Sequence, residues 1–395
     1  MDKKFKISKV DALIYISTFA CFKIDILSYV SKGFTFFYLL LELFCAIYFT
    51  LKILSQEKLQ IIDIATVVYC SWGLISTIFN SISLDTWLRE TIRMVAMIYA
   101  LRWGLKHNPQ CYIHTNAIYI GWLTIINTIV ACIIAPNPLL YDNGVSPIFI
   151  LGGDNTSVRI YILAVLFSLL AINNKRRQKY FAFLVWLSFV LFSWVRDLGT
   201  GKICVFILTI GSIVYILKKR SLPKNTLKII GIVNVILFFI LIVVNNISAF
   251  SYVIVKVLHR DLTLTARTVI WNITIKKIAE SPILGNGYVT GKQFESMLPG
   301  IIGVNAHNTF LMMLYMGGII LLLMFVITYL STQKVYDAQR HKELYNILPI
   351  AFMAMLVRSQ VEGGDAAFLF FMCHFIYRIS KQEQSVKFEK INNRL

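Results

Sequence analysis

The chain has 395 residues, of which 57% are hydrophobic and 15% charged, with a formal net charge of +19 and a mean hydropathy of +0.68. A soluble protein carries about a quarter charged residues, so this composition excludes an ordinary soluble domain. The apolar residues recur in runs of about 20, the length of a helix that crosses a bilayer. Because these runs do not alternate, they exclude a transmembrane barrel, and we predict an all-α integral membrane protein.

Twelve spans are predicted, and no soluble domain remains between them. In chain order they are 11–29, 34–53, 60–79, 86–105, 111–135, 158–172, 180–194, 201–217, 229–245, 307–329, 347–361 and 366–379. We therefore expect a single polytopic domain over residues 1–395. The first span carries Lys23 and Asp25 and has no small-residue cleavage site, so we expect it to remain as an anchor.

The basic residues predict the orientation. Loops on one side hold most of the 39 Lys and Arg residues, whereas the short loops on the other side carry only Lys32 and Arg196. The positive-inside rule places the basic loops, and with them both termini, in the cytoplasm. Residues 248–306 then form a large extracytoplasmic loop. Topology and anionic lipid headgroups explain most of the charge, so we expect no nucleic-acid partner.

A set of basic residues lies at or near the predicted outer ends of spans: Arg89, Arg93, Arg159, Arg196, Lys202, Arg267 and Arg358. Charges within spans are costly and usually functional, and the Arg fork can bind two phosphate oxygens. Together they suggest an anionic, phosphate-bearing ligand that enters from the outer leaflet. The alternative is local pairing of Arg89 or Arg93 with Glu90, of Arg196 with Asp197, and of Arg358 with Glu362. Arg159, Lys202 and Arg267 have no carboxylate close in the sequence under this interpretation.

Residues 268–280, within the large loop, have the pattern of a helix that lies at a membrane interface, with one apolar and one charged row. Thr265 can cap this helix, and Ser281-Pro282 ends it. Arg267 falls in the first turn, where a helix N-terminus and a guanidinium together favour an anion. Gly285-Asn286-Gly287 then turns the chain. The alternative is a surface helix that binds no ligand.

His307 stands at the start of a predicted span on the outer side, which it shares only with His259 among the six His residues. A neutral imidazole there could take a proton from a sugar hydroxyl. The alternative, which is commoner for a lone His, is a structural residue held by hydrogen bonds.

Four pieces follow one another in this region: Arg267 with Trp271, the run Ser281-Pro282-Ile283-Leu284-Gly285-Asn286-Gly287, the run His307-Asn308-Thr309-Phe310-Leu311, and Gly317-Gly318. Their order resembles the O-antigen ligase / Wzy polymerase superfamily, whose pattern is an Arg and a Trp, P-[IL]-[LF]-G-x-G, and H-N-x-[FY]-L before a Gly-containing helix. The run Gly152-Gly153-Asp154-Asn155 also resembles the polymerases. Two positions depart from the family: Lys202 replaces a common Arg, and Leu321 stands where a second Gly is usual.

The resemblance implies a GT-C-like glycosyltransferase that needs neither metal nor cofactor. The donor would be a glycan on undecaprenyl pyrophosphate, and the acceptor another lipid-linked repeat unit in a polymerase or a lipid A core in a ligase. We predict His307 and Arg267 as catalytic residues. The predicted substrate-binding residues are Arg159, Lys202, Arg196, Asn308, Trp271, Arg89 and Arg358.

The function expected from this resemblance is a polymerase that builds a surface polysaccharide (capsule, exopolysaccharide or O-antigen) at the outer face of a bacterial cytoplasmic membrane. Membrane lipid, a flippase and a chain-length regulator are the further partners considered. An O-antigen ligase remains an alternative. A polysaccharide transporter or flippase is an alternative of another class, although the two halves of the sequence show no similarity of the kind common in transporters. A non-catalytic assembly scaffold is a third.

Overall fold

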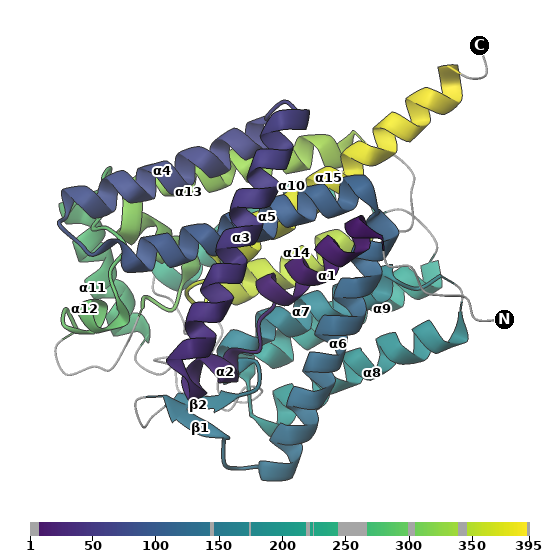
Figure 1. The fold of residues 1–395 in the computed structure, drawn as a ribbon. Helices are drawn as coiled ribbons and strands as arrows, with labels where there is room; N and C mark the ends of the chain where they lie inside the picture. Colours follow the sequence, from purple (N-terminus) through teal and green to yellow (C-terminus); the bar gives the residue numbers. More distant parts are fainter. Residues whose placement is uncertain are drawn as a thin grey trace. The chain divides into compact units, whose positions relative to one another are not determined.

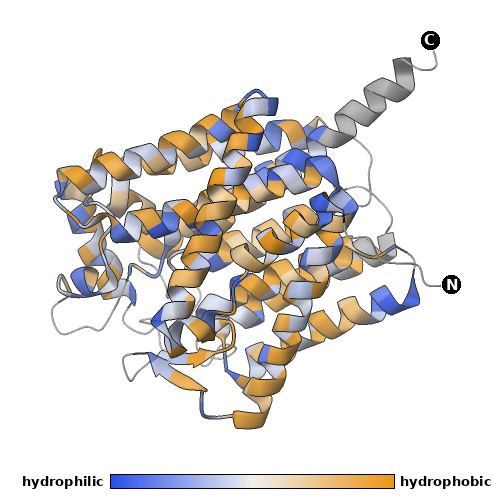
Figure 2. Ribbon diagram, in the orientation of Figure 1, coloured by the Kyte–Doolittle hydropathy of each residue, from blue (hydrophilic) through white to orange (hydrophobic). Residues whose placement is uncertain are grey.

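The computed structural model describes residues 8–142, 146–173, 175–218, 222–223, 225–243, 267–298, 305–338 and 346–392. These residues are largely helical, as predicted. Five of the described helices are long and apolar enough to cross a membrane: α3 (Lys32–Gln56), α4 (Ile61–Phe79), α6 (Pro109–Ile134), α8 (Arg176–Val195) and α13 (Thr309–Asp337). Figure 2 shows hydrophobic residues along the long helices and a hydrophilic run at the start of α8.

The chain divides into two compact units, each of which combines separate segments. The first unit comprises residues 1–58 and 92–219, and the second comprises residues 59–91 and 220–395. The single domain expected over residues 1–395 stays a prediction, because this division into compact units does not test it. Of the predicted outer loop 248–306, residues 248–266 and 299–304 lie outside the described part of the chain, and so does the predicted cap Thr265.

The first unit is built around a helix whose side chains are almost all buried, α7 (Asp154–Leu170). It packs against α6 and α8, and α6 also contacts α1. The other helices of this unit are α1 (Lys9–Cys21), α2 (Asp25–Val30), α3, α9 (Gly199–Lys218) and residues 92–107 of α5 (Leu84–His107). The predicted first span 11–29 is therefore wrong as a continuous helix. The chain breaks between α1 and α2, where Lys23 and Asp25 form an ion pair at 3.6 Å.

A small antiparallel sheet in the first unit was not predicted. Its strands are β1 (Leu140–Asp142), β2 (Ser146–Phe149) and β3 (Gly152–Gly153), in that spatial order. Leu140 pairs with Ile148, and Phe149 pairs with Gly152. Ile148 and Phe149 are buried, and the Phe149 ring meets Phe192 of α8 edge-on at 6.1 Å. The connection before α7 is thus an ordered sheet, which corrects the all-α prediction in this one place.

The second unit is organised around α13, which packs against α4, α11 (Arg267–Glu280) and α15 (Ala366–Asn392). Figure 1 shows α4 and α13 side by side. The remaining elements are residues 84–91 of α5, α10 (Thr226–Phe238), its π-helical continuation η1 (Phe239–Val243), α12 (Gly291–Glu295) and α14 (Ile347–Ser359). The helix predicted over 268–280 is confirmed to within one residue as α11.

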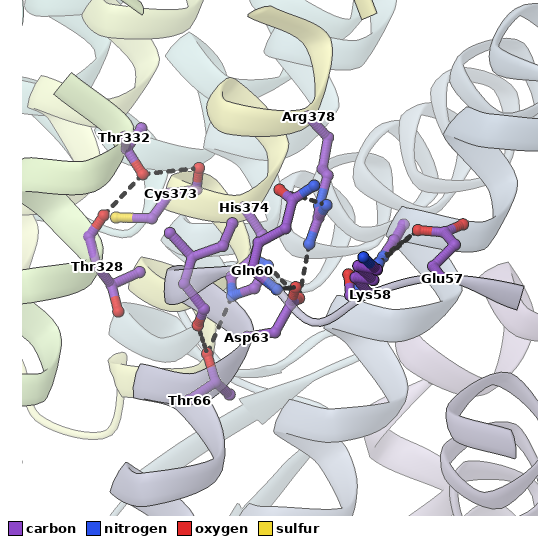
Figure 3. Close-up of polar contacts among 12 residues, drawn as sticks. Glu57, Lys58, Gln60, Asp63, Thr66, Thr328, Thr332, Cys373, His374 and Arg378 are labelled. Atoms are coloured by element: carbon purple, nitrogen blue, oxygen red, sulfur yellow. Dashed lines mark hydrogen bonds and ion pairs between the residues drawn. The ribbon is translucent and has the colours of Figure 1, made fainter. Parts of the chain in front are cut away.

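A buried polar network joins α4 to α15 at the end of the unit where α4 begins (Figure 3). Arg378 donates to Asp63 Oδ1 at 2.6 Å and to Gln60 Oε1 at 2.9 Å. His374 Nε2 lies 3.0 Å from Thr66 Oγ1, and neither Asp63 nor His374 has exposed surface. Because buried charges require partners, this network fixes α15 along α4.

Candidate functional site

The predicted Gly-Asn-Gly turn lies against the middle of α13. Gly285 and Gly287 have φ of +77° and +79°, a region that glycine enters without steric cost. The Asn286 amide donates to the carbonyl of Tyr315 at 2.7 Å, and the Gly287 amide donates to the carbonyl of Met316 at 3.0 Å. The turn thus takes up carbonyl groups of α13 that the helix itself leaves free.

Those carbonyl groups are free because α13 is broken at Gly317 and Gly318. Gly318 has φ +63° and ψ −162°, far from helical values. A Cβ at Gly318 would collide with the carbonyl group of Ile283, so the segment before the turn fits only against glycine. Trp72 of α4 donates to the carbonyl of Gly317 at 2.9 Å. The P-I-L-G-N-G run and the Gly pair of the resemblance therefore form one backbone junction.

Trp271 connects α11 to the start of α13. Its indole nitrogen donates to the carbonyl of Ala306 at 2.9 Å, and the side chain is 1% exposed. The residue after Ala306 is His307, and Arg267 lies one turn before Trp271 on α11. Trp271 therefore holds the two predicted catalytic residues in a fixed relation, and its substrate-binding role stays a prediction.

Arg267 and His307 face the same carboxylate, that of Glu362 in the loop between α14 and α15. Arg267 Nη2 lies 2.9 Å from Glu362 Oε1, and His307 Nδ1 lies 3.8 Å from Glu362 Oε2. The side chains are 16% exposed for Arg267, 29% for His307 and 7% for Glu362. We call these three residues the Arg267–Glu362–His307 cluster. The cation and the imidazole are partly exposed, whereas the carboxylate is nearly buried.

The backbone around His307 is unusual. His307 has φ +46°, a conformation that is uncommon for a residue with a side chain and that often marks functional sites. Its amide donates to Asn305 Oδ1 at 2.7 Å. Asn308 then caps α13, since its Oδ1 accepts from the amide of Leu311 at 2.9 Å. Asn308 is fully buried and also donates to the carbonyl of Gln360 at 2.8 Å, so its predicted contact with the acceptor stays a prediction.

Glu362 remains ionised despite its burial. Desolvation raises the pKa of this carboxyl, but the guanidinium of Arg267, with smaller contributions from His307 and Arg358, lowers the pKa to about 2. Arg358 itself forms an ion pair with Asp365, and neither side chain has exposed surface. Glu362, and not Asp365, was the partner named for Arg358 from the sequence.

The other predicted cations have partners of their own. Arg89 is exposed and donates to the carbonyl of Asp85 on the same helix at 3.2 Å. In the first unit, Arg196 pairs with Asp154 at 3.2 Å, a partner that was not expected. Lys202 pairs with Asp197, so the expectation that Lys202 has no carboxylate nearby in the sequence was wrong.

Arg159 is half-buried in the second turn of α7. Arg159, Arg196 and Lys202 thus all belong to the first unit. The second unit brings together Arg267, His307, Asn308, Trp271 and Arg358 around the loop that carries Glu362.

Sequence reasoning named Glu362 only as a partner for Arg358 and missed it as part of the site. A signal was present, because Glu362 is a carboxylate between two predicted spans on the side where charges are few. Among the described residues, no group of three or more His, Cys, Asp or Glu side chains could hold a metal ion. The cluster offers an Arg for an anion and a half-buried imidazole next to a nearly buried carboxylate.

No family model, curated protein or solved structure matches this chain.

Proposed function

We propose that the chain is a membrane glycosyltransferase that polymerises a surface polysaccharide from repeat units carried on undecaprenyl pyrophosphate. The observation that carries this proposal is that Arg267 and His307 share one carboxylate, although 95 positions separate Arg267 from Glu362 in the sequence. The resemblance over residues 267–318 supplies the reaction class, and the contacts of Arg267 and His307 supply a chemical arrangement suited to it.

The chemistry needs two groups. The leaving group is a lipid pyrophosphate, whose negative charge grows as the bond to the sugar breaks. Arg267 can stabilise this charge with its planar fork of donors. The acceptor hydroxyl must lose a proton as its oxygen bonds to the anomeric carbon, and the base that we propose is His307, which shares Glu362 with Arg267.

Topology supports the same proposal. We place twelve spans of a GT-C-like fold in the cytoplasmic membrane of a bacterium, with both termini in the cytoplasm. Under the positive-inside rule, Lys58 before α4 and Lys334 near the end of α13 are cytoplasmic. His307 precedes α13 and Glu362 follows α14, so the Arg267–Glu362–His307 cluster is at the outer ends of these helices. There it meets the leaflet in which a flipped lipid-linked glycan resides.

A cell-free assay tests the proposal. Purified protein in lipid nanodiscs is incubated with undecaprenyl-pyrophosphate-linked repeat units, and the glycan length is followed on gels. A ladder of longer glycans without any ion gradient supports a polymerase. Transfer that appears only after a lipid A core is added indicates a ligase, and no transfer with either acceptor contradicts the proposal and leaves a transporter or a scaffold.

Two Arg267 variants sharpen this assay. R267A is expected to abolish the ladder while the protein level in the membrane is kept, and R267K is expected to restore only part of it, because Lys lacks the fork. K277A is the matched control, because Lys277 lies on the same helix in an exposed pair with Glu280 at 2.8 Å. Full activity in R267A would refute the role of Arg267.

A further inference from the structure

One carboxylate serves two partners in the Arg267–Glu362–His307 cluster. Glu362 Oε1 accepts from Arg267 at 2.9 Å, which is a charge-assisted hydrogen bond. Glu362 Oε2 lies 3.8 Å from His307 Nδ1, which is too far for a hydrogen bond. His307 Nδ1 is buried and has no hydrogen-bond partner among the described residues. The Glu362 carboxylate is therefore hydrogen-bonded to the guanidinium of Arg267, whereas His307 Nδ1 makes no hydrogen bond within the described residues.

We propose that Glu362 is a positioning residue that links donor binding to base activation: an anionic leaving group draws the guanidinium of Arg267 away, and the released carboxylate then orients His307. This inference rests on the proposed function. Pyrophosphate oxygens and the Glu362 carboxylate compete for the same donors of Arg267, because both are anions that suit its fork.

The change required is small. A shift of about 1 Å would bring His307 Nδ1 and Glu362 Oε2 into hydrogen-bonding distance. With Nδ1–H donating to Glu362, the lone pair of Nε2 is directed at the acceptor hydroxyl. The hydroxyl proton passes to Nε2 as the acceptor oxygen bonds to the anomeric carbon, and the electron pair of the broken C–O bond leaves with the pyrophosphate. The imidazolium that forms is stabilised by the carboxylate of Glu362.

Glu362 is poorly suited to be the base itself. It is 7% exposed, its Oε1 is bonded to Arg267, and its pKa of about 2 makes it a weak base. The other charged residues at this point are Arg358 and Asp365, which pair with each other without exposed surface. His307 is the most exposed of the three residues, at 29%, so a role through His307 fits Glu362 better than direct contact with substrate.

The test compares E362Q with wild type in two separate measurements. In the first, inorganic pyrophosphate is titrated onto purified protein. E362Q is expected to bind it roughly 10-fold more tightly, because Gln lacks the negative charge with which Glu362 competes for Arg267. In the second, the turnover of E362Q with lipid-linked repeat units is expected to fall at least about 10-fold, because His307 loses its orienting charge. A purely structural role for Glu362 would lower affinity and turnover together.

E280Q is the matched control, since Glu280 forms an exposed pair with Lys277 and both measurements should stay at wild-type values. If E362Q does not fold, E362D keeps the charge on a shorter side chain. E362D is then expected to keep the pyrophosphate affinity within a few-fold and to lose turnover. In the double variant H307A/E362Q, turnover should be no lower than in H307A, because Glu362 acts through His307.

Pyrophosphate affinity in E362Q that is unchanged or weaker, or turnover at the wild-type level, contradicts this inference. For E362D, turnover at the wild-type level has the same meaning. If wild-type protein extends no lipid-linked glycan, the proposed function is contradicted instead. The pyrophosphate titration still tests whether Glu362 and pyrophosphate compete for Arg267.

Discussion

The amide of Ile319 in α13 donates to the carbonyl of Pro282 at 2.8 Å, so a residue from the middle of a long apolar helix is bonded to the loop that follows α11. This bond is possible because α13 is broken at the preceding glycine pair. It connects α11, which carries Arg267, to α13, which begins after His307. The junction therefore keeps both elements of the Arg267–Glu362–His307 cluster in register.

Gly318→Ala is expected to destabilise the protein by more than about 3 kcal/mol, because the new methyl group both strains a backbone at φ +63° and collides with Ile283. Gly364→Ala is the control, because Gly364 has φ +77° but no atom within 4 Å of a Cβ. The control should be destabilised only by backbone strain, by about 1 kcal/mol. The free energy of unfolding in mixed micelles is measured for both variants. Equal losses of stability would contradict the close contact between Gly318 and Ile283.

Asp365→Asn is expected to cost about 3–5 kcal/mol of stability, since it leaves the guanidinium of Arg358 buried without its counter-charge. Asp197→Asn is the comparison, because Asp197 is 54% exposed in its pair with Lys202 and should change stability by less than about 1 kcal/mol. Unfolding in mixed micelles gives both values. A small effect of Asp365→Asn would mean that the pairing with Asp365 is not what stabilises the buried Arg358.

Glu362 predicts a pH dependence of stability. Its pKa is about 2 in the folded protein against an ordinary 4.5, so ionisation of Glu362 favours the folded state. The stabilisation, of the order of 3 kcal/mol, is fully present above about pH 4.5 and is lost as the pH falls toward 2. The difference in unfolding free energy between wild type and E362Q should therefore shrink over this range. A difference in unfolding free energy that is constant from pH 6 to pH 3 would show that the stabilisation does not come from the charge of Glu362.

The orientation of the chain can be read with single cysteines in a background without the 7 native ones. Gln293 is exposed on α12 in the predicted outer loop, and a cysteine there is expected to react with a membrane-impermeant thiol reagent in whole cells. Lys334, exposed near the far end of α13, is the control, and a cysteine there should react only after lysis. The reverse pattern would overturn the proposed topology.

Local features of the site could be predicted from the sequence because they depend on nearby residues. Apolar spacing and the following Ser281-Pro282 predicted α11, and the apolar run after Asn308 predicted the start of α13. The Gly-Asn-Gly turn also followed from the freedom of glycine at positive φ. Each of these signals acts within a few residues of the element that it specifies.

Other features depend on contacts between distant segments, and sequence patterns alone do not reveal those. The pairing of Arg267 with Glu362 joins residues 95 positions apart. The break at Gly318 depends on a carbonyl from Ile283, and no property of α13 alone requires it. The sheet of β1, β2 and β3 was missed because strands this short carry no clear alternation.

The most direct test of the account is the single-turnover rate of His307→Gln with lipid-linked repeat units bound to the purified protein. Gln keeps a hydrogen-bonding side chain but cannot accept the proton of the acceptor hydroxyl. If His307 is the base, the rate should fall by about 100- to 10,000-fold while donor affinity is nearly unchanged. A His307→Gln protein that retains most of the wild-type rate would contradict the account, because His307 would then only position a group and the base would lie elsewhere.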